Sequence, residues 1–101
     1  PLLAGANGDA FQESLLDRIL PRLRDFGPDL ILISAGFDAH ERDPLGGLRL
    51  VEQDFSEATK RLMDLADRRC GGRLVSLLEG GYALEGLSRS VSAHVLALMG
   101  A

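Results

Sequence analysis

The apolar positions in the first quarter of the chain recur at helical spacing. They are Phe11, Leu15, Ile19 and Leu23. Residues three to four positions apart share one face of a helix, so this segment predicts an amphipathic helix capped by Asp9, with Gln12 completing a capping box. Pro21 lies inside the pattern. Because an interior proline lacks an N–H group and clashes with the preceding turn, we expect a kink, or a break into two short helices that end near Gly27.

Two short apolar runs predict β-strands, and helical spacing returns between and after them. The runs are Leu-Ile-Leu-Ile at 30–33 and Leu-Val-Ser-Leu-Leu at 74–78. The first run does not alternate polar with apolar residues, which is typical of a strand covered on both faces in a parallel sheet. A helix of about five turns is predicted between the strands, ending at Gly71 and Gly72, and a last amphipathic helix is predicted over 84–98.

This order of elements predicts an α/β chain and the edge of the sheet at which its chemistry lies. A strand–helix–strand crossover is almost always right-handed, with its two strands parallel. Ligands of open parallel sheets bind outside the carboxyl ends of the strands, which here are the loops after Ile33 and Leu78. These loops contain Asp38 and Tyr82.

Composition narrows the class of protein. The 101 residues can build one modest core, and the formal charge of −4 without any basic run argues against direct nucleic-acid binding. Cys70 is the only cysteine, so neither an internal disulfide nor a cysteine-based zinc site can form, which fits a reducing compartment. No apolar stretch approaches the roughly 18 residues of a membrane span, and the start of the chain lacks signal-peptide order. We expect a cytoplasmic protein without a membrane partner.

Two segments carry distinctive motifs. Residues 34–47 read Ser-Ala-Gly-Phe-Asp-Ala-His-Glu-Arg-Asp-Pro-Leu-Gly-Gly, and residues 78–82 read Leu-Glu-Gly-Gly-Tyr. Together they resemble the C-terminal signatures of the histone deacetylase and acetylpolyamine amidohydrolase family, above all its class II and bacterial members. The resemblance runs from end to end and implies a fragment of the three-layer, parallel-sheet arginase/deacetylase-type fold. We therefore expect residues 1–101 to be an incomplete domain, the C-terminal segment of a deacetylase domain truncated before Pro1.

The resemblance implies hydrolysis of an acyl amide with the help of zinc, which lowers the pKa of water and polarises the carbonyl group. The family holds zinc with two aspartates and one histidine, and by motif position Asp38 is one of these aspartates. Tyr82 matches the catalytic tyrosine, whose hydroxyl group donates a hydrogen bond to the developing oxyanion. Gly80 and Gly81 are expected to let the backbone pass close to the bound acyl chain. Leu45 is expected to line the mouth of the acyl tunnel.

The remaining polar residues have structural explanations. Asp38 and His40 form an Asp-x-His pair whose side chains could point the same way on an extended chain, but the resemblance makes this a single-ligand motif, so we expect His40 to be solvated. Asp43 is expected to organise its loop by accepting hydrogen bonds from nearby N–H groups. His94 is expected to be structural. Ala83 stands where many relatives carry Asn or Asp, so the last helix is expected to lack a side-chain cap.

Two functions from different classes remain open. The first is part of a zinc-dependent amide hydrolase that removes acetyl or other acyl groups from lysine side chains or related amines. The family's His-His base, its Asp-x-His ligands and its monovalent-cation site have no counterpart here, so we expect this chain alone neither to bind zinc tightly nor to deacetylate. The second is a non-catalytic α/β binding or self-assembly module that retains the loop motifs. Exposed sheet edges and apolar faces favour self-association in either case.

Overall fold

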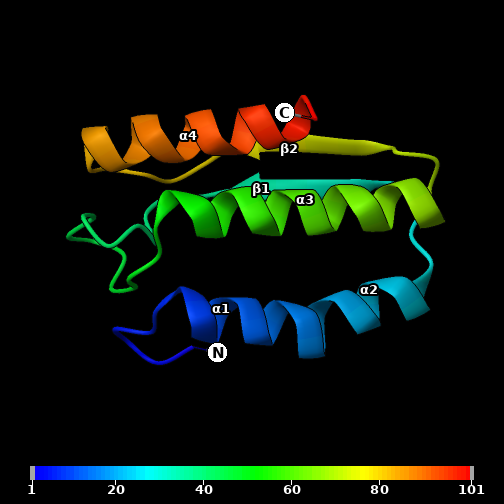
Figure 1. Cartoon of the computed structure of the whole chain (residues 1–101), viewed down its shortest axis with the longest axis horizontal. Helices are drawn as coiled ribbons and strands as arrows, with labels where there is room; N and C mark the ends of the chain where they lie inside the picture. The colour runs from blue at the N-terminus through cyan, green and yellow to red at the C-terminus, as the bar shows by residue number, and fades with distance from the viewer. Residues whose placement is uncertain (1, 101) are drawn as a thin grey trace.

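The computed structural model describes residues 2–100 and forms a two-stranded parallel sheet with its helices packed on one face (Figure 1). The elements in chain order are α1 (Gly8–Ser14), the π-helical segment η1 (Leu15–Ile19), α2 (Leu20–Phe26), β1 (Ile31–Ala35), α3 (Glu52–Arg69), β2 (Leu74–Leu78) and α4 (Leu84–Leu98). The prediction of a βαβ unit with parallel strands is confirmed. No helix among residues 2–100 combines the length and the apolar character that a membrane span requires.

The N-terminal helix passes Pro21 without a gap. In η1 the N–H group of Leu20 donates to the carbonyl of Leu15, five residues back, and α2 follows at once. Because Pro21 lacks an N–H group and its ring would collide with a carbonyl of the preceding turn of a regular α-helix, we attribute the wider π turn to this residue. Of the two expected outcomes, a kink or a break, the break is therefore wrong, and the helix instead departs from regular α geometry just before Pro21. The predicted end is confirmed, since Gly27 closes α2 with a φ of 67°.

The predicted cap of this helix is also wrong. The side-chain oxygen of Asn7, and not that of Asp9, accepts a hydrogen bond from the N–H group of Ala10 at 3.2 Å. The side chain of Gln12 instead donates to the main-chain oxygen of Asp54 at 3.0 Å, which ties α1 to the first turn of α3. The tertiary contact takes the place of the local capping box.

The sheet is covered on one face only. Its strands pair in register from Ile31 with Leu74 to Ala35 with Leu78. Alternate side chains of β1 point into the helical layer, whereas Leu32 on the opposite face is 65 % exposed and Leu77, on the same face of β2, is 60 % exposed. The prediction of a strand covered on both faces is therefore wrong for the described residues, because all the helices lie on the same side.

The core consists of two clusters that lie at opposite ends of the sheet. The first contains Ile31, Leu65, Ala66 and Cys70, and the second contains Ala35, Phe37, Leu50 and Phe55. Cys70 is buried at the end of α3, as its structural interpretation predicted. In the second cluster the rings of Phe37 and Phe55 meet edge to face, with 5.1 Å between centroids. This cluster anchors the start of the loop that follows β1.

His94 is a buried structural residue, as predicted. Its Nδ1 lies 2.7 Å from the hydroxyl of Thr59, and its Nε2 lies 2.8 Å from the hydroxyl of Ser76. The Thr59 hydroxyl donates its hydrogen to the carbonyl of Phe55 at 2.6 Å, so it accepts from His94 and Nδ1 carries a hydrogen. Burial lowers the pKa of His94 because it disfavours the charged ring.

We expect His94 to make the fold less stable in mild acid. Because its pKa is lower in the folded chain than the usual 6.5, the unfolded chain binds the proton first, and stability falls as the pH drops below about 6.5. Each tenfold preference of the unfolded chain for the proton costs about 1.4 kcal/mol, or roughly 6 to 11 °C in a domain of this size. Thermal unfolding between pH 5.5 and 7.5 measures this, and His94→Gln should flatten the slope. An unchanged slope in that variant would contradict the assignment.

Candidate active site

The loops after β1 and β2 meet at the carboxyl ends of the two strands, where the sequence places its motifs. The N–H group of Phe37 donates to the carbonyl of Gly80 at 2.8 Å, and the N–H group of Glu79 donates to the carbonyl of Ala35 at 3.0 Å. These two backbone hydrogen bonds join the loops across the edge of the sheet. The structure therefore brings the segment containing Asp38 and the segment containing Tyr82 together.

Glycines surround Asp38 closely. A Cβ atom on Gly36 or on Gly80 would lie 3.1 Å from a carboxylate oxygen of Asp38, and a Cβ atom on Gly46 would overlap its main-chain oxygen. Three segments of backbone therefore approach one aspartate closely: a side chain would be tight at Gly36 and Gly80 and would not fit at Gly46. The predicted close approach at Gly80 is to this carboxylate.

The carboxylate of Asp38 is available as a ligand. No group within residues 2–100 donates a hydrogen bond to either of its oxygens, although the side chain is half-buried. A half-buried carboxylate that lacks hydrogen-bond donors suits a hard cation. Within the same residues, no three His, Cys, Asp or Glu side chains are grouped so that they could hold a metal ion. Asp38 thus fits a metal site as one ligand, and the described residues do not form a complete site.

Tyr82 follows a backbone conformation that requires glycine. Gly81 has a φ of 138°, and a Cβ atom there would lie 2.7 Å from a methyl group of Leu87. The side chain of Tyr82 is 58 % exposed, so its hydroxyl group is accessible. Leu45, on the opposite loop, is exposed as well. The roles predicted for Tyr82 and Leu45 stay predictions, since their positions are compatible with those roles but do not test them.

Asp43 links the two loops through its carboxylate. Its Oδ1 accepts from the N–H group of Leu45 at 2.9 Å, and its Oδ2 accepts from those of Tyr82 at 2.7 Å and Ala83 at 3.1 Å. Burial alone would raise the pKa of Asp43, but the backbone donors, led by Tyr82, outweigh it and lower the pKa. The predicted loop-organising role is confirmed. The same carboxylate serves the N-terminus of α4, whose Ala83 offers no side-chain cap.

We expect Asp43→Asn to release Tyr82. An amide side chain is uncharged and has one acceptor oxygen in place of two, so either Leu45 or the pair Tyr82 and Ala83 loses its acceptor, and the remaining bonds lose a charged partner. Amide exchange at Tyr82 should therefore rise about tenfold. The lowered pKa means that the carboxylate stabilises the fold above about pH 4, and that this contribution disappears as the pH falls through its folded pKa. In Asp43→Asn, the stability of the fold should no longer include this pH-dependent contribution. Asp67→Asn, on the exposed side of α3, is the control. Unchanged exchange at Tyr82 would contradict the link.

The prediction that His40 is solvated is wrong. The side chain is 2 % exposed, and its ring packs against Gly86 of α4, where a Cβ atom would lie 2.8 Å from Nδ1. The signal available in the sequence was Gly86 itself, since a glycine inside a helical pattern often marks a close approach of another group.

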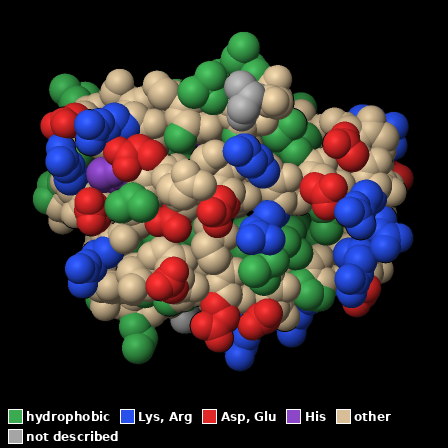
Figure 2. Space-filling view, in the orientation of Figure 1, with side chains coloured by type: hydrophobic (Ala, Val, Ile, Leu, Met, Phe, Trp, Pro, Cys, Tyr) green, Lys and Arg blue, Asp and Glu red, His purple; other side chains and the backbone are tan. Residues whose placement is uncertain are grey.

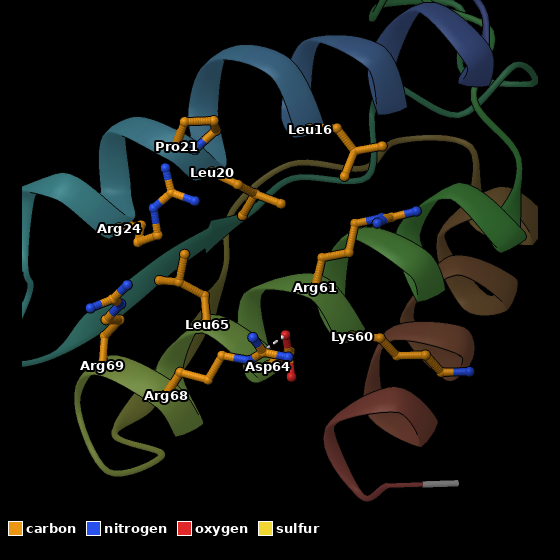
Figure 3. A pocket seen from close by; sticks show the side chains of 10 residues that line it. All are labelled: Leu16, Leu20, Pro21, Arg24, Lys60, Arg61, Asp64, Leu65, Arg68 and Arg69. Carbon is orange, nitrogen blue, oxygen red and sulfur yellow. Dashed lines mark ion pairs between the residues drawn. The ribbon is translucent and has the colours of Figure 1, made fainter.

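A groove along the helices lies away from these loops (Figure 3). It has a volume of about 440 Å³ and runs between the N-terminal helix and the later turns of α3. Its lining combines apolar side chains with basic ones: Leu16, Leu20, Pro21, Arg24, Lys60, Arg61, Leu65, Arg68 and Arg69. Its one carboxylate, Asp64, pairs with Arg68 at 3.1 Å. Figure 2 shows positive side chains gathered at the end of the molecule where α2 and α3 finish. The groove holds none of the residues that the predicted chemistry needs.

The chain is similar to known proteins over almost its whole length. The family model "Histone deacetylase domain" matches residues 1–98. A relative named "Type-2 histone deacetylase 1" from Dictyostelium discoideum is 51 % identical over 80 residues, covering 79 % of this chain and 5 % of that protein. "Histone deacetylase 10, chloroplastic" from Oryza sativa subsp. japonica is 43 % identical over 99 residues, covering 97 % of this chain and 22 % of that protein.

The same similarity appears in three dimensions. The solved "HDA15 HD domain" superposes with a TM-score of 0.89 and 37 % identity, covering 97 % of this chain and 27 % of that domain. This chain spans 5 % and 22 % of the lengths of the two relatives above. The predicted fold class and the predicted family are both confirmed by these matches.

Proposed function

Because the chain belongs to the histone deacetylase family, we propose that it is the C-terminal segment of a zinc-dependent domain that removes acetyl or other acyl groups from lysine side chains or related amines. The observation that carries the proposal is the pair of hydrogen-bonded loops at the carboxyl ends of β1 and β2. These loops combine an accessible tyrosine hydroxyl, at Tyr82, with a carboxylate, at Asp38, to which no group in residues 2–100 donates a hydrogen bond.

Asp38 is the residue of this chain that would hold zinc. When bound, zinc supplies a Lewis acid that polarises the amide carbonyl and lowers the pKa of water. The remaining ligands and the general base would come from the rest of the domain, since three protein ligands are usual in a catalytic zinc site. Gly36 and Gly80 support this assignment because they leave room for the carboxylate against the backbone.

The other site residues would act on the substrate. The hydroxyl of Tyr82 would donate a hydrogen bond to the substrate carbonyl oxygen as negative charge develops on it. Asp43 would orient Tyr82 through its backbone N–H group, at 2.7 Å. Gly80 and Gly81 would form the floor of the acyl site, and exposed Leu45 would offer apolar surface at its mouth.

The apolar outer face of the sheet supports the view that this chain is incomplete as an enzyme. Leu32 and Leu77 lie exposed on it, and burying such a face is favourable by about 25 cal/mol per Å². We propose that the rest of the domain covers this face in the complete protein, and that isolated residues 1–101 associate with one another through it. Size-exclusion chromatography of residues 1–101 at low concentration tests the association, and a clean monomer would count against it. Self-association through this face, without catalysis, is the alternative function.

The experiment that tests the main proposal compares the complete protein with residues 1–101. The complete protein should copurify with zinc and hydrolyse an acetyl-lysine peptide or an acetylated polyamine, whereas residues 1–101 should do neither. Absence of both activities from the complete, zinc-loaded protein would refute the proposal, and turnover by residues 1–101 alone would refute the division of ligands. A cytoplasmic location, for which the lone Cys70 is the support, belongs to the same proposal, and a fluorescent fusion confined to an organelle would contradict it.

A further inference from the structure

His40 is the shared residue of two consecutive turns that lead from Asp38 to Asp43. Its N–H group donates to the carbonyl of Phe37 at 3.2 Å, which closes the turn that carries Asp38. Its carbonyl accepts from the N–H group of Asp43 at 2.9 Å, which closes the next turn. Asp43 in turn accepts the N–H group of Tyr82. Two hydrogen-bonded turns and the Asp43 carboxylate therefore lead from the turn that carries Asp38 to the backbone of Tyr82, and His40 belongs to both turns.

The side chain of His40 also stabilises the backbone between these two turns, because its ring lies inside the loop. Nδ1 accepts a hydrogen bond from the N–H group of Arg42 at 3.1 Å, two residues further along, as the side chain of an Asx turn does. An acceptor at Nδ1 places the ring hydrogen of the neutral imidazole on Nε2. Nε2 is buried and lies 3.5 Å from a carboxylate oxygen of Glu52 at the start of α3, with no closer hydrogen-bond partner in residues 2–100.

The helices on both sides of the loop hold the ring in place. Glu52 also lies 3.6 Å from a guanidinium nitrogen of Arg89 on α4. The pKa of Glu52 is lowered, chiefly by a hydrogen bond from its own backbone N–H group and further by His40 and Arg89, against the opposing effect of burial. Gly86 of α4 lies directly against the imidazole, where any side chain would collide with it. The ring is thus enclosed by its own turn, by α3 and by α4.

We infer that His40 is a positioning residue that holds the Asp38 turn and the Asp43–Tyr82 connection as one rigid loop. It touches neither substrate nor metal in this role. The turn bond at Nδ1 sets the path of the chain between Asp38 and Asp43, and the packing against Gly86 and Glu52 fixes that path relative to the helices. This inference rests on the proposed function for its catalytic consequence, whereas the rigidity of the loop is a property of the fold alone.

The test uses the complete protein and three variants. His40→Ala removes the turn bond and the packing, and His40→Asn retains an acceptor oxygen at the position of Nδ1. In Gly86→Ala the new methyl group collides with the imidazole of His40. Because alanine has a higher helix propensity than glycine, the substitution displaces His40 without lowering the helix propensity of α4. Hydrogen exchange at the amides of Leu45 and Tyr82 reports the loop. Hydrolysis of an acetyl-lysine peptide reports kcat and KM separately.

We expect amide exchange at Leu45 and Tyr82 to rise about tenfold in His40→Ala and Gly86→Ala, and kcat to fall by about 10- to 100-fold with KM within about threefold. His40→Asn should recover most of both. Leu65→Ala is the matched control, because it weakens α3 through the other core cluster and should lower the melting temperature without loosening these amides.

Each possible result of these measurements either supports or contradicts the positioning role of His40. Unchanged loop exchange in His40→Ala would overturn the inference, as would His40→Asn behaving like His40→Ala. Equal loosening in Leu65→Ala would show a general loss of stability in place of positioning. If the loop loosens as expected but the wild-type protein hydrolyses no acyl amide, the proposed function fails while the positioning role of His40 stands.

Discussion

Replacement of Asp38 by alanine is expected to abolish zinc binding and deacetylation by the complete protein. Loss of a partner that merely supports a ligand costs about 10- to 100-fold in metal affinity or activity, so loss of a ligand should cost more. The fold should survive, because no group in residues 2–100 depends on this carboxylate for a hydrogen bond. Zinc content by mass spectrometry, kcat/KM on an acetyl-lysine peptide and the melting temperature of the metal-free protein measure the three expectations.

The matched control is Asp17→Ala, an exposed aspartate of η1 that lies outside the site loops. It should retain zinc and full activity. Stability distinguishes the two explanations for Asp38. If Asp38 formed a turn, Asp38→Ala would lower the melting temperature of the metal-free protein, whereas if Asp38 is a ligand, that melting temperature stays unchanged. A variant that keeps zinc and loses only stability would therefore overturn the assignment of Asp38 as a ligand.

The elements that could be predicted from the sequence are those specified by local pattern. The run at 74–78 is a strand with the predicted bounds, and 84–98 is a helix with the predicted bounds. Both follow from residues that are neighbours in the chain, namely an unbroken apolar run and apolar side chains at helical spacing. The parallel pairing of the strands followed as well, because a crossover helix permits little else.

The features that could not be predicted depend on distant parts of the chain. His40 is buried against Gly86, which lies 46 positions later, and the side chain of Gln12 donates to the main-chain oxygen of Asp54 in another helix. The hydrogen bond from the N–H group of Tyr82 to the carboxylate of Asp43 likewise joins residues that are 39 positions apart. Coverage of β1 on both faces was expected from its composition, yet composition does not say which chain segment supplies the second layer. Local pattern determines none of these three contacts, since each forms only when the chain has folded.

Sequence motif and geometry contribute different parts of the candidate site. The motif singled out Asp38 and Tyr82 by their resemblance to a known family, and geometry shows that the two segments are hydrogen-bonded to each other through Phe37 and Gly80. Geometry also adds residues that the motif did not explain. Asp43 and His40 belong to the same loop, touch no substrate in the proposed scheme, and together determine where Tyr82 sits.

Replacement of Tyr82 by phenylalanine is expected to lower kcat of the complete protein by about 10²- to 10³-fold while zinc content and KM stay close to normal. Loss of a single hydrogen-bond donor to a developing oxyanion typically costs this much, and an interaction made only in the transition state lowers kcat without raising KM. The substitution removes one hydroxyl group. It leaves the backbone N–H group that donates to Asp43 at 2.7 Å, so the loop should keep its path.

Three measurements separate this role from a structural one. The exposed ring of Tyr82 contributes little to the core, so the melting temperature of Tyr82→Phe should match that of the wild type. Leu84→Ala, which shortens another exposed side chain two positions later, should leave kcat within about twofold. Asp43→Asn, which frees the backbone of Tyr82, should lower kcat together with increased amide exchange. If Tyr82→Phe retained kcat within about twofold, the oxyanion donor would have to be a group other than a tyrosine of this chain, because Tyr82 is its only tyrosine.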